Sequence, residues 1–230
     1  MTTSTFRSHG EGRRVEVRTR SVGLEGDLGI PRDAGGIVLF AHGSGSSRHS
    51  LRNRFVAELL REGHLGTFLI DLLTAEEEAA DAATGYLRFD IDLLGDRLVA
   101  ITDWLLAHPE TRALPIGYFG ASTGAGAALV AASRRAAAVH AVVSRGGRPD
   151  LAWSFLPQVM APTLLIVGGH DFAVLDLNKK ALEALCVEKA LAVVPGATHL
   201  FEEPGALEEV ARLAREWFDH HLAERQEEGG

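Results

Sequence analysis

Cysteine is almost absent from this chain of 230 residues, which contains only Cys186. A single cysteine excludes an internal disulfide and is typical of a reducing compartment, so we expect a cytoplasmic protein. Lysine is also rare: it occurs only at positions 179, 180 and 189, and the arginines are scattered along the chain. Because the net charge is −8, electrostatics gives no support for nucleic acid or an anionic membrane as a partner.

Long apolar runs are missing as well. No stretch approaches the ~18 apolar residues of a membrane span, and the first residues lack the apolar core of a signal peptide. The phosphate-cradling motifs G-x-G-x-x-G and G-x-x-x-x-G-K-[ST] do not occur, and no cluster has metal-ligand spacing. The sequence therefore predicts no cofactor and no metal.

What the chain does have is an apolar content of 46%, enough to fill the core of one domain over residues 1–223. Residues 224–230 are polar and predict a disordered tail. Strands are predicted at Arg14–Arg20, Leu24–Ile30, Gly36–Ala41, Thr67–Leu72, 115–119, 137–144, 162–167 and 190–194. Helices are predicted at Asn53–Arg61, Asp90–His108, after Ser122, and at Leu151–Gln158, Asp176–Leu185 and Pro204–Ala223. This alternation predicts an α/β fold with about eight strands, mostly parallel, and helices on both faces.

The most informative motif is Gly120-Ala121-Ser122-Thr123-Gly124. An apolar run precedes it and a run of small residues follows it, which is the strand–turn–helix context of a nucleophile elbow. The turn is sharp, so the residues two before and two after the serine must be small. We therefore expect Ser122 to be a nucleophile, with a simple helix N-cap as the alternative.

A serine needs a base, and the base needs an orienting acid. In this fold the acid and then the histidine follow the serine, each after a strand. Asp171 follows the predicted strand 162–167 and His199 follows 190–194, so these two residues complete the expected triad. Asp150, one strand earlier, is the main rival as the acid, and Asp176 is a weaker one.

The glycine-rich stretch His42–Ser47 follows the predicted strand Gly36–Ala41. A tetrahedral intermediate of acyl transfer needs preorganised N–H donors near the developing oxyanion. One donor is expected from the backbone of Thr123, and the other from Ser44 or, as second choice, Gly45. Phosphate binding by this loop is the alternative, and the missing motifs argue against it.

These residues resemble the α/β-hydrolase superfamily, and within it the small branch similar to dienelactone hydrolases. The resemblance covers Val15 to about Leu222 and implies an α/β-hydrolase fold. One departure is that dienelactone hydrolases carry cysteine at the elbow, whereas this chain has Ser122. The loop His42–Ser47 and the segment Asp71–Thr74 also resemble bacterial hydrolase domains that are sometimes fused to phosphoribosyltransferases.

The expected function is therefore a serine esterase that cleaves small or medium carboxylic esters, working as a monomer or small homo-oligomer. An acyltransferase or thioesterase using the same triad, a lactone hydrolase, a C–C or amide hydrolase and a non-catalytic scaffold remain as alternatives. Only residues 145–161 separate two strands where related enzymes carry a cap domain, so no full cap is expected.

Three further residues are predicted to line the substrate pocket. The acidic segment 76–89, which contains Tyr86, is the candidate lid or pocket wall, and its alternative is a solvated loop. Arg145, past a strand end, is a candidate contact for a substrate carboxylate, with a salt bridge as the alternative. His42 is expected to hold the loop that follows it, and a role as the base is the alternative.

Overall fold

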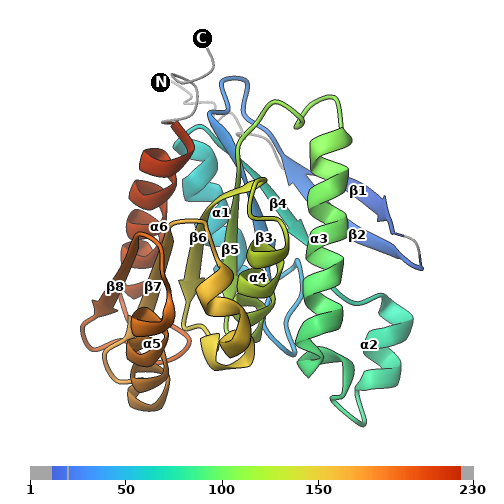
Figure 1. Ribbon diagram of the computed structural model, residues 1–230. Coiled ribbons are helices and arrows are strands. Elements are labelled where there is room, and N and C mark those ends of the chain that lie inside the picture. The colour runs from blue at the N-terminus through green and yellow to red at the C-terminus, as the bar shows by residue number, and fades with distance from the viewer. Residues whose placement is uncertain (1–11, 20, 224–230) are drawn as a thin grey trace, which may run out of the picture.

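The computed structural model describes residues 12–19 and 21–223 (Figure 1). Its strands are β1 (Arg13–Arg18), β2 (Gly23–Gly29), β3 (Gly36–Ala41), β4 (Leu65–Ile70), β5 (Ile116–Ala121), β6 (Val139–Arg145), β7 (Thr163–Gly168) and β8 (Lys189–Val194). Its helices are α1 (Leu51–Glu62), α2 (Ala75–Asp81), α3 (Ile91–Ala107), α4 (Thr123–Arg134), α5 (Phe172–Ala184) and α6 (Ala206–Ala223). Two 3₁₀ segments, η1 (Leu87–Phe89) and η2 (Pro149–Gln158), complete the described elements. The predicted tail, 224–230, lies outside the described residues.

One sheet of eight strands forms the centre, in the order β1-β2-β4-β3-β5-β6-β7-β8. The β1–β2 hairpin is antiparallel and joins β4 antiparallel, while the pairs from β4 to β8 are all parallel. The prediction of a mostly parallel sheet of eight strands is therefore confirmed. The carboxyl ends of the parallel strands share one edge, which is where an open α/β sheet places its ligands.

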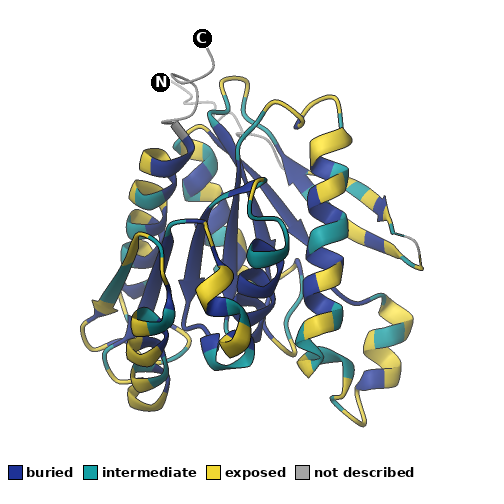
Figure 2. Cartoon of the chain, in the orientation of Figure 1, coloured by how far each residue is buried: buried dark blue, intermediate teal, exposed yellow. Residues whose placement is uncertain are grey.

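Helices cover both faces of the sheet (Figure 1). One face packs against α3, α4 and α5 with η2, and the other against α1 and α6. Successive residues of β3 alternate between the two cores: Ile37 and Leu39 lie in the first, and Val38 and Phe40 in the second. Because both faces are covered, the central strands are continuously apolar and buried throughout (Figure 2).

Two helices differ clearly from the prediction. Helix α5 begins at Phe172, four residues before the predicted Asp176; Asp171 is at its N-cap position but makes no side-chain capping bond, because its carboxylate bonds His199. Helix α2 was not predicted, although Thr74 and Glu77 form a capping box at its start, a signal visible in the sequence. The single cysteine, Cys186, is exposed beyond the end of α5.

None of the helices within residues 12–19 and 21–223 is both long and apolar enough to cross a bilayer.

The contact between α4 and the end of β3 predicts a large stability effect. A Cβ atom added at Gly124 would lie 2.3 Å from the carbonyl oxygen of Ala41 and 2.4 Å from that of His42. Both are backbone atoms, so α4 would have to move away from the sheet. We expect Gly124→Ala to lower the free energy of unfolding, measured by urea denaturation, by about 3 kcal/mol or more.

The matched control is Gly35→Ala, because nothing lies within 4 Å of a Cβ added at Gly35. We expect this control to change the unfolding free energy by less than about 1 kcal/mol. If Gly124→Ala unfolds at the same urea concentration as Gly35→Ala, the result would contradict the close packing of α4 on β3.

Candidate active site

Ser122 lies between the last residue of β5 and the first residue of α4, with φ of 51° and ψ of −121°. A non-glycine residue in this region of φ/ψ space is strained, and such strain is typical of functional sites. The neighbouring glycine is required by space: a Cβ at Gly120 would lie 2.4 Å from the Cα of Ala125. The glycines of the motif therefore allow the sharp turn that presents the Ser122 hydroxyl.

The structure brings Ser122, His199 and Asp171 together. His199 Nε2 is 3.3 Å from Ser122 Oγ, and His199 Nδ1 is 2.6 Å from Asp171 Oδ2. Since the carboxylate only accepts, Nδ1 carries the proton and donates it, which leaves Nε2 as the acceptor for the serine proton. This is the arrangement of a nucleophile, its base and its orienting acid.

The rival acids do not reach His199. Asp150 forms a two-pronged ion pair with Arg148, with nitrogen–oxygen distances of 2.8 and 2.7 Å. Asp176 lies on α5 and contacts Lys179 at 3.3 Å. Among the three predicted candidates, only Asp171 contacts the histidine.

Backbone hydrogen bonds hold the two loops of the triad against each other. The loop after β7 and the loop after β8 are joined by Gly169 N–H donating to the Val194 carbonyl at 2.8 Å and His170 N–H donating to Ala197 at 2.9 Å. The hydroxyl of Thr198 donates to Glu203 at 2.6 Å, and this hydrogen bond lowers the pKa of the Glu203 carboxyl. The segments that carry Asp171 and His199 are therefore held together by hydrogen bonds.

The N–H groups predicted to bind the oxyanion differ in whether they already have a hydrogen-bond acceptor. Thr123 is the first residue of α4, so its backbone N–H has no acceptor within the helix. The Ser44 N–H, the first choice for the second donor, instead donates to Thr123 Oγ1 at 2.7 Å. The structure thus shows this N–H engaged by a side chain, and an oxyanion would have to replace that bond. Gly45 adopts a φ of 70° in the same loop.

His42 is a structural residue of that loop. Its Nε2 accepts the backbone N–H of Leu72 at 3.1 Å, so the proton lies on Nδ1, which is 3.0 Å from the Gly43 carbonyl. Both ring nitrogens are engaged by backbone. His42 therefore holds the loop between β3 and α1, and neither of its ring nitrogens is open to act as a base.

Arg48 was not predicted, yet it anchors the other end of this loop. Its backbone N–H donates to Asp71 Oδ1 at 2.6 Å, and its buried guanidinium pairs with Asp71 Oδ2 and, at 2.5 Å, with Glu25. Burial acts to lower the pKa of Arg48, but the hydrogen bond and charge of Asp71, with the charges of Glu25 and Asp27, raise it. Its partners lie 23 residues away on each side, a separation that no sequence motif marks.

A cavity of about 320 Å³ opens beside the loop. Its lining combines the loop after β3, the segment after β4 and one residue each from α3 and α4: His42, Gly43, Ser44, Gly45, Ser46, Ser47, Leu72, Leu73, Glu78, Asp81, Arg88, Leu94 and Thr123. Segment 76–89 therefore forms a wall of the cavity, rather than a fully solvated loop.

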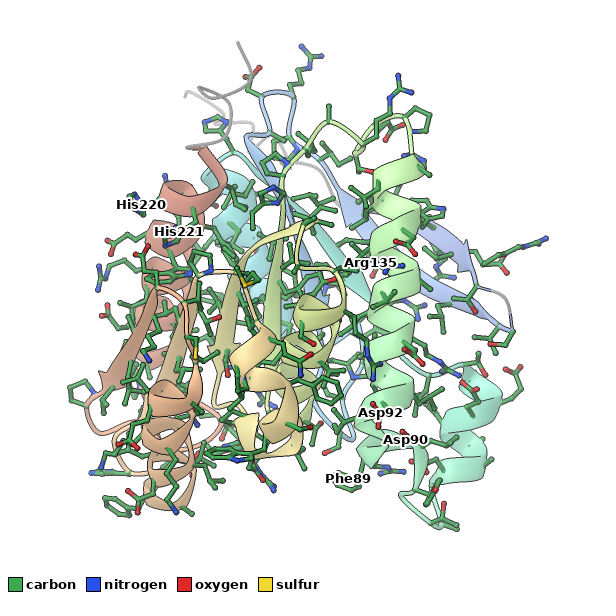
Figure 3. The ribbon with its side chains drawn as sticks, in the orientation of Figure 1. Phe89, Asp90, Asp92, Arg135, His220 and His221 are labelled. Carbon is green, nitrogen blue, oxygen red and sulfur yellow. The ribbon has the colours of Figure 1, made fainter. Side chains whose placement is uncertain are left out.

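Asp81 organises this wall. It is buried, and it accepts hydrogen bonds from the Arg88 side chain at 2.6 Å and from the backbone N–H of Leu87 at 2.6 Å. Burial acts to raise the pKa of Asp81, but these bonds lower it overall. Figure 3 shows Phe89 and Asp90 at the lower end of α3, where this wall meets the helix. Tyr86 is 75% exposed and is not among the residues that line this cavity, so its place in the substrate pocket stays a prediction.

Arg145 is likewise not among the residues that line the cavity. Its guanidinium is buried, donates to Asn53 Oδ1 at 3.2 Å and lies 5.7 Å from the centre of the Phe201 ring. Burial, with the nearby charge of Arg52, lowers the pKa of Arg145 to about 10. The expectations of a substrate contact or a salt bridge are both corrected: the cation packs beneath the loop that carries His199.

The sheet order and the elbow at the end of β5 define the class of protein, an α/β-hydrolase. The model of the dienelactone hydrolase family matches residues 25–222, and the chain belongs to that family. The family and the fold support hydrolase activity.

Solved structures of other proteins have the same fold. A dienelactone hydrolase from Anabaena variabilis is 61% identical, with a TM-score of 0.92, and the match covers 93% of this chain and 99% of that one. Est1E from Butyrivibrio proteoclasticus shares the fold at 15% identity, with a TM-score of 0.76 over 92% of this chain and 99% of its own.

A curated relative from Mycobacterium tuberculosis strain H37Rv bears the name "Putative phosphoribosyl transferase Rv0571c" and is 58% identical over 208 residues. The match covers 90% of this chain but 46% of the relative, so the chain spans about half the length of the curated relatives it matches.

Proposed function

We propose that this hydrolase is a serine esterase that cleaves small or medium carboxylic esters through an acyl-enzyme. The observation that carries the proposal is the continuous chain of hydrogen bonds from Ser122 through His199 to Asp171, with the serine on a strained turn. A non-catalytic scaffold would not need these three side chains to lie within contact distance of one another.

In the proposed mechanism, the Ser122 oxygen attacks the ester carbonyl carbon while His199 Nε2 takes the serine proton. Asp171 stabilises the resulting imidazolium, and the Thr123 N–H donates to the oxyanion. His199 then gives its proton to the leaving alcohol, and the acyl group remains on Ser122. Water attacks this ester with His199 again acting as base, which releases the acid and restores the serine.

The cavity supports a substrate of modest size. A volume of about 320 Å³ lies at the lower end of the range for small-molecule pockets. The ester's acyl or alcohol part would contact the wall formed by segment 76–89, whose Glu78, Asp81 and Arg88 line the cavity together with Leu72 and Leu94.

A lactone is the second candidate substrate, because a lactone is a cyclic ester and the relative at 61% identity is named a dienelactone hydrolase. The same triad would open it, with the leaving alcohol still attached to the acyl group. An acyltransferase or thioesterase would use the same steps with another acceptor or leaving group. The name phosphoribosyl transferase belongs to relatives about twice as long, and the triad described above supports hydrolysis rather than that transfer.

The test is labelling with a fluorophosphonate probe, followed by mass-spectrometric mapping of the adduct. We expect one adduct per chain on Ser122, because His199 activates this serine without requiring a particular substrate. The adduct should disappear in His199→Ala, while Ser133→Ala, a change at the far end of α4, should label normally. Folded protein that gives no adduct, or an adduct elsewhere, would contradict the proposal and favour a non-catalytic scaffold.

A further inference from the structure

A second group of chemically active side chains lies at the opposite edge of the sheet from the triad. Glu188 immediately precedes β8, and His220 and His221 lie near the end of α6 (Figure 3). One ligand atom from each of these three residues lies within 4.8 Å of the others. His199 follows the other end of β8, so the strand separates the two groups.

The three side chains suit one metal ion. Two imidazoles and a carboxylate form a donor set that Zn²⁺ uses in proteins, with bond lengths of about 2.0–2.2 Å. Tetrahedral ligands at such distances lie roughly 3.4 Å apart. His221 Nε2 and Glu188 Oε1 are already 3.6 Å apart, so this pair needs little adjustment, and the other ligand atoms, within 4.8 Å of one another, need to close by at most about 1.4 Å.

The three side chains differ in burial. His221 is buried, and its ring contacts Trp217 edge-on with centroids 4.4 Å apart. Glu188 and His220 are exposed, and the ring of His220 lies 4.6 Å from that of His221. The site therefore combines one buried ligand with two exposed ones.

The end of a helix favours a cation, because its last carbonyl groups carry a partial negative charge. The three ligands come from the end of α6 and from the segment before β8, so a bound ion would join the helix to the edge of the sheet. Ligation of the folded state alone stabilises that state by mass action.

We propose that Glu188, His220 and His221 bind one Zn²⁺ ion, which fastens the end of α6 to the β8 edge and takes no part in the chemistry at Ser122. No sequence motif marks this site, because its ligands are two adjacent histidines and a glutamate 32 residues before the first of them, a spacing unlike the usual zinc motifs.

The experiment is isothermal titration calorimetry of zinc chloride into untagged protein that has been stripped with EDTA and dialysed, paired with a thermal-unfolding measurement. We expect saturable binding of one ion per chain and a higher Tm with zinc. Glu188→Gln and His220→Ala should each weaken binding by about tenfold or more and remove the Tm increase. Both residues are exposed, so these variants should fold.

The matched control is His108→Ala. The ring centroids of His108 and Trp104 lie 4.4 Å apart, the same distance as those of His221 and Trp217, but His108 is not part of this cluster. This control and Ser122→Ala should bind zinc as the unaltered chain does. No saturable binding, or binding that Glu188→Gln and His220→Ala leave unchanged, would overturn the proposal. Ester turnover is measured separately, so a failure of this site and a failure of the triad are distinguishable.

Discussion

Replacing Ser122 by alanine is expected to lower kcat for hydrolysis of a simple ester by about 10⁴-fold or more. The alanine cannot form the acyl-enzyme, and the His199 Nε2 that lies 3.3 Å from the hydroxyl loses the group it acts on. Steady-state kinetics on a short-chain p-nitrophenyl ester provide the measurement. KM should change little, because the substitution removes the nucleophile and leaves the residues that line the cavity unchanged.

Two comparisons make this result specific. His199→Ala should lower kcat about as much as Ser122→Ala does. The double variant should lower kcat little further, because the effects of groups that act as a unit are not additive. Ser133→Ala should retain full activity, since the Ser133 hydroxyl bonds only the Val130 carbonyl on the same helix. Full esterase activity in purified Ser122→Ala would refute the acyl-enzyme mechanism.

Asp171→Asn has the second-largest expected effect, a decrease in kcat of about 10⁴-fold with the fold intact. Asp171 accepts the Nδ1 proton of His199 at 2.6 Å, which keeps Nε2 unprotonated toward the serine. An asparagine amide can donate to Nδ1 instead, which favours the tautomer with its proton on Nε2 and removes the base. Kinetics at pH 7.5, with a circular dichroism spectrum to check folding, measure this effect.

The matched control is Asp150→Asn, which makes the same change from carboxylate to amide at the other candidate acid. Asp150 pairs with Arg148 and does not contact His199, so this variant should keep its kcat within about threefold of the unaltered chain. If the losses were reversed, with Asp150→Asn inactive and Asp171→Asn active, Asp150 would be the acid and the described loop geometry would be wrong.

The sequence determined the fold and predicted the three residues that the structure brings together, because both depend on local order along the chain. Apolar runs of strand length alternate with helical segments, and this alternation leads to a parallel sheet whose carboxyl ends share an edge. The Gly120–Gly124 motif, Asp171 and His199 each follow such a run, so their order alone placed them near one another. Space explains the rest of the motif, since a Cβ at Gly120 or Gly124 would meet backbone atoms below 2.5 Å.

Only the tertiary structure decided which polar groups already have a hydrogen-bond or ion-pair partner. The Ser44 N–H meets the Thr123 hydroxyl from a residue 79 positions away, and Arg48 meets the carboxylates of Glu25 on β2 and of Asp71 directly after β4. Arg145 ends strand β6, at the same edge of the sheet as the triad, yet its guanidinium is buried and lies over the Phe201 ring. Such contacts depend on the direction of each side chain and on partners distant in sequence, which the local pattern of apolar and polar residues does not encode.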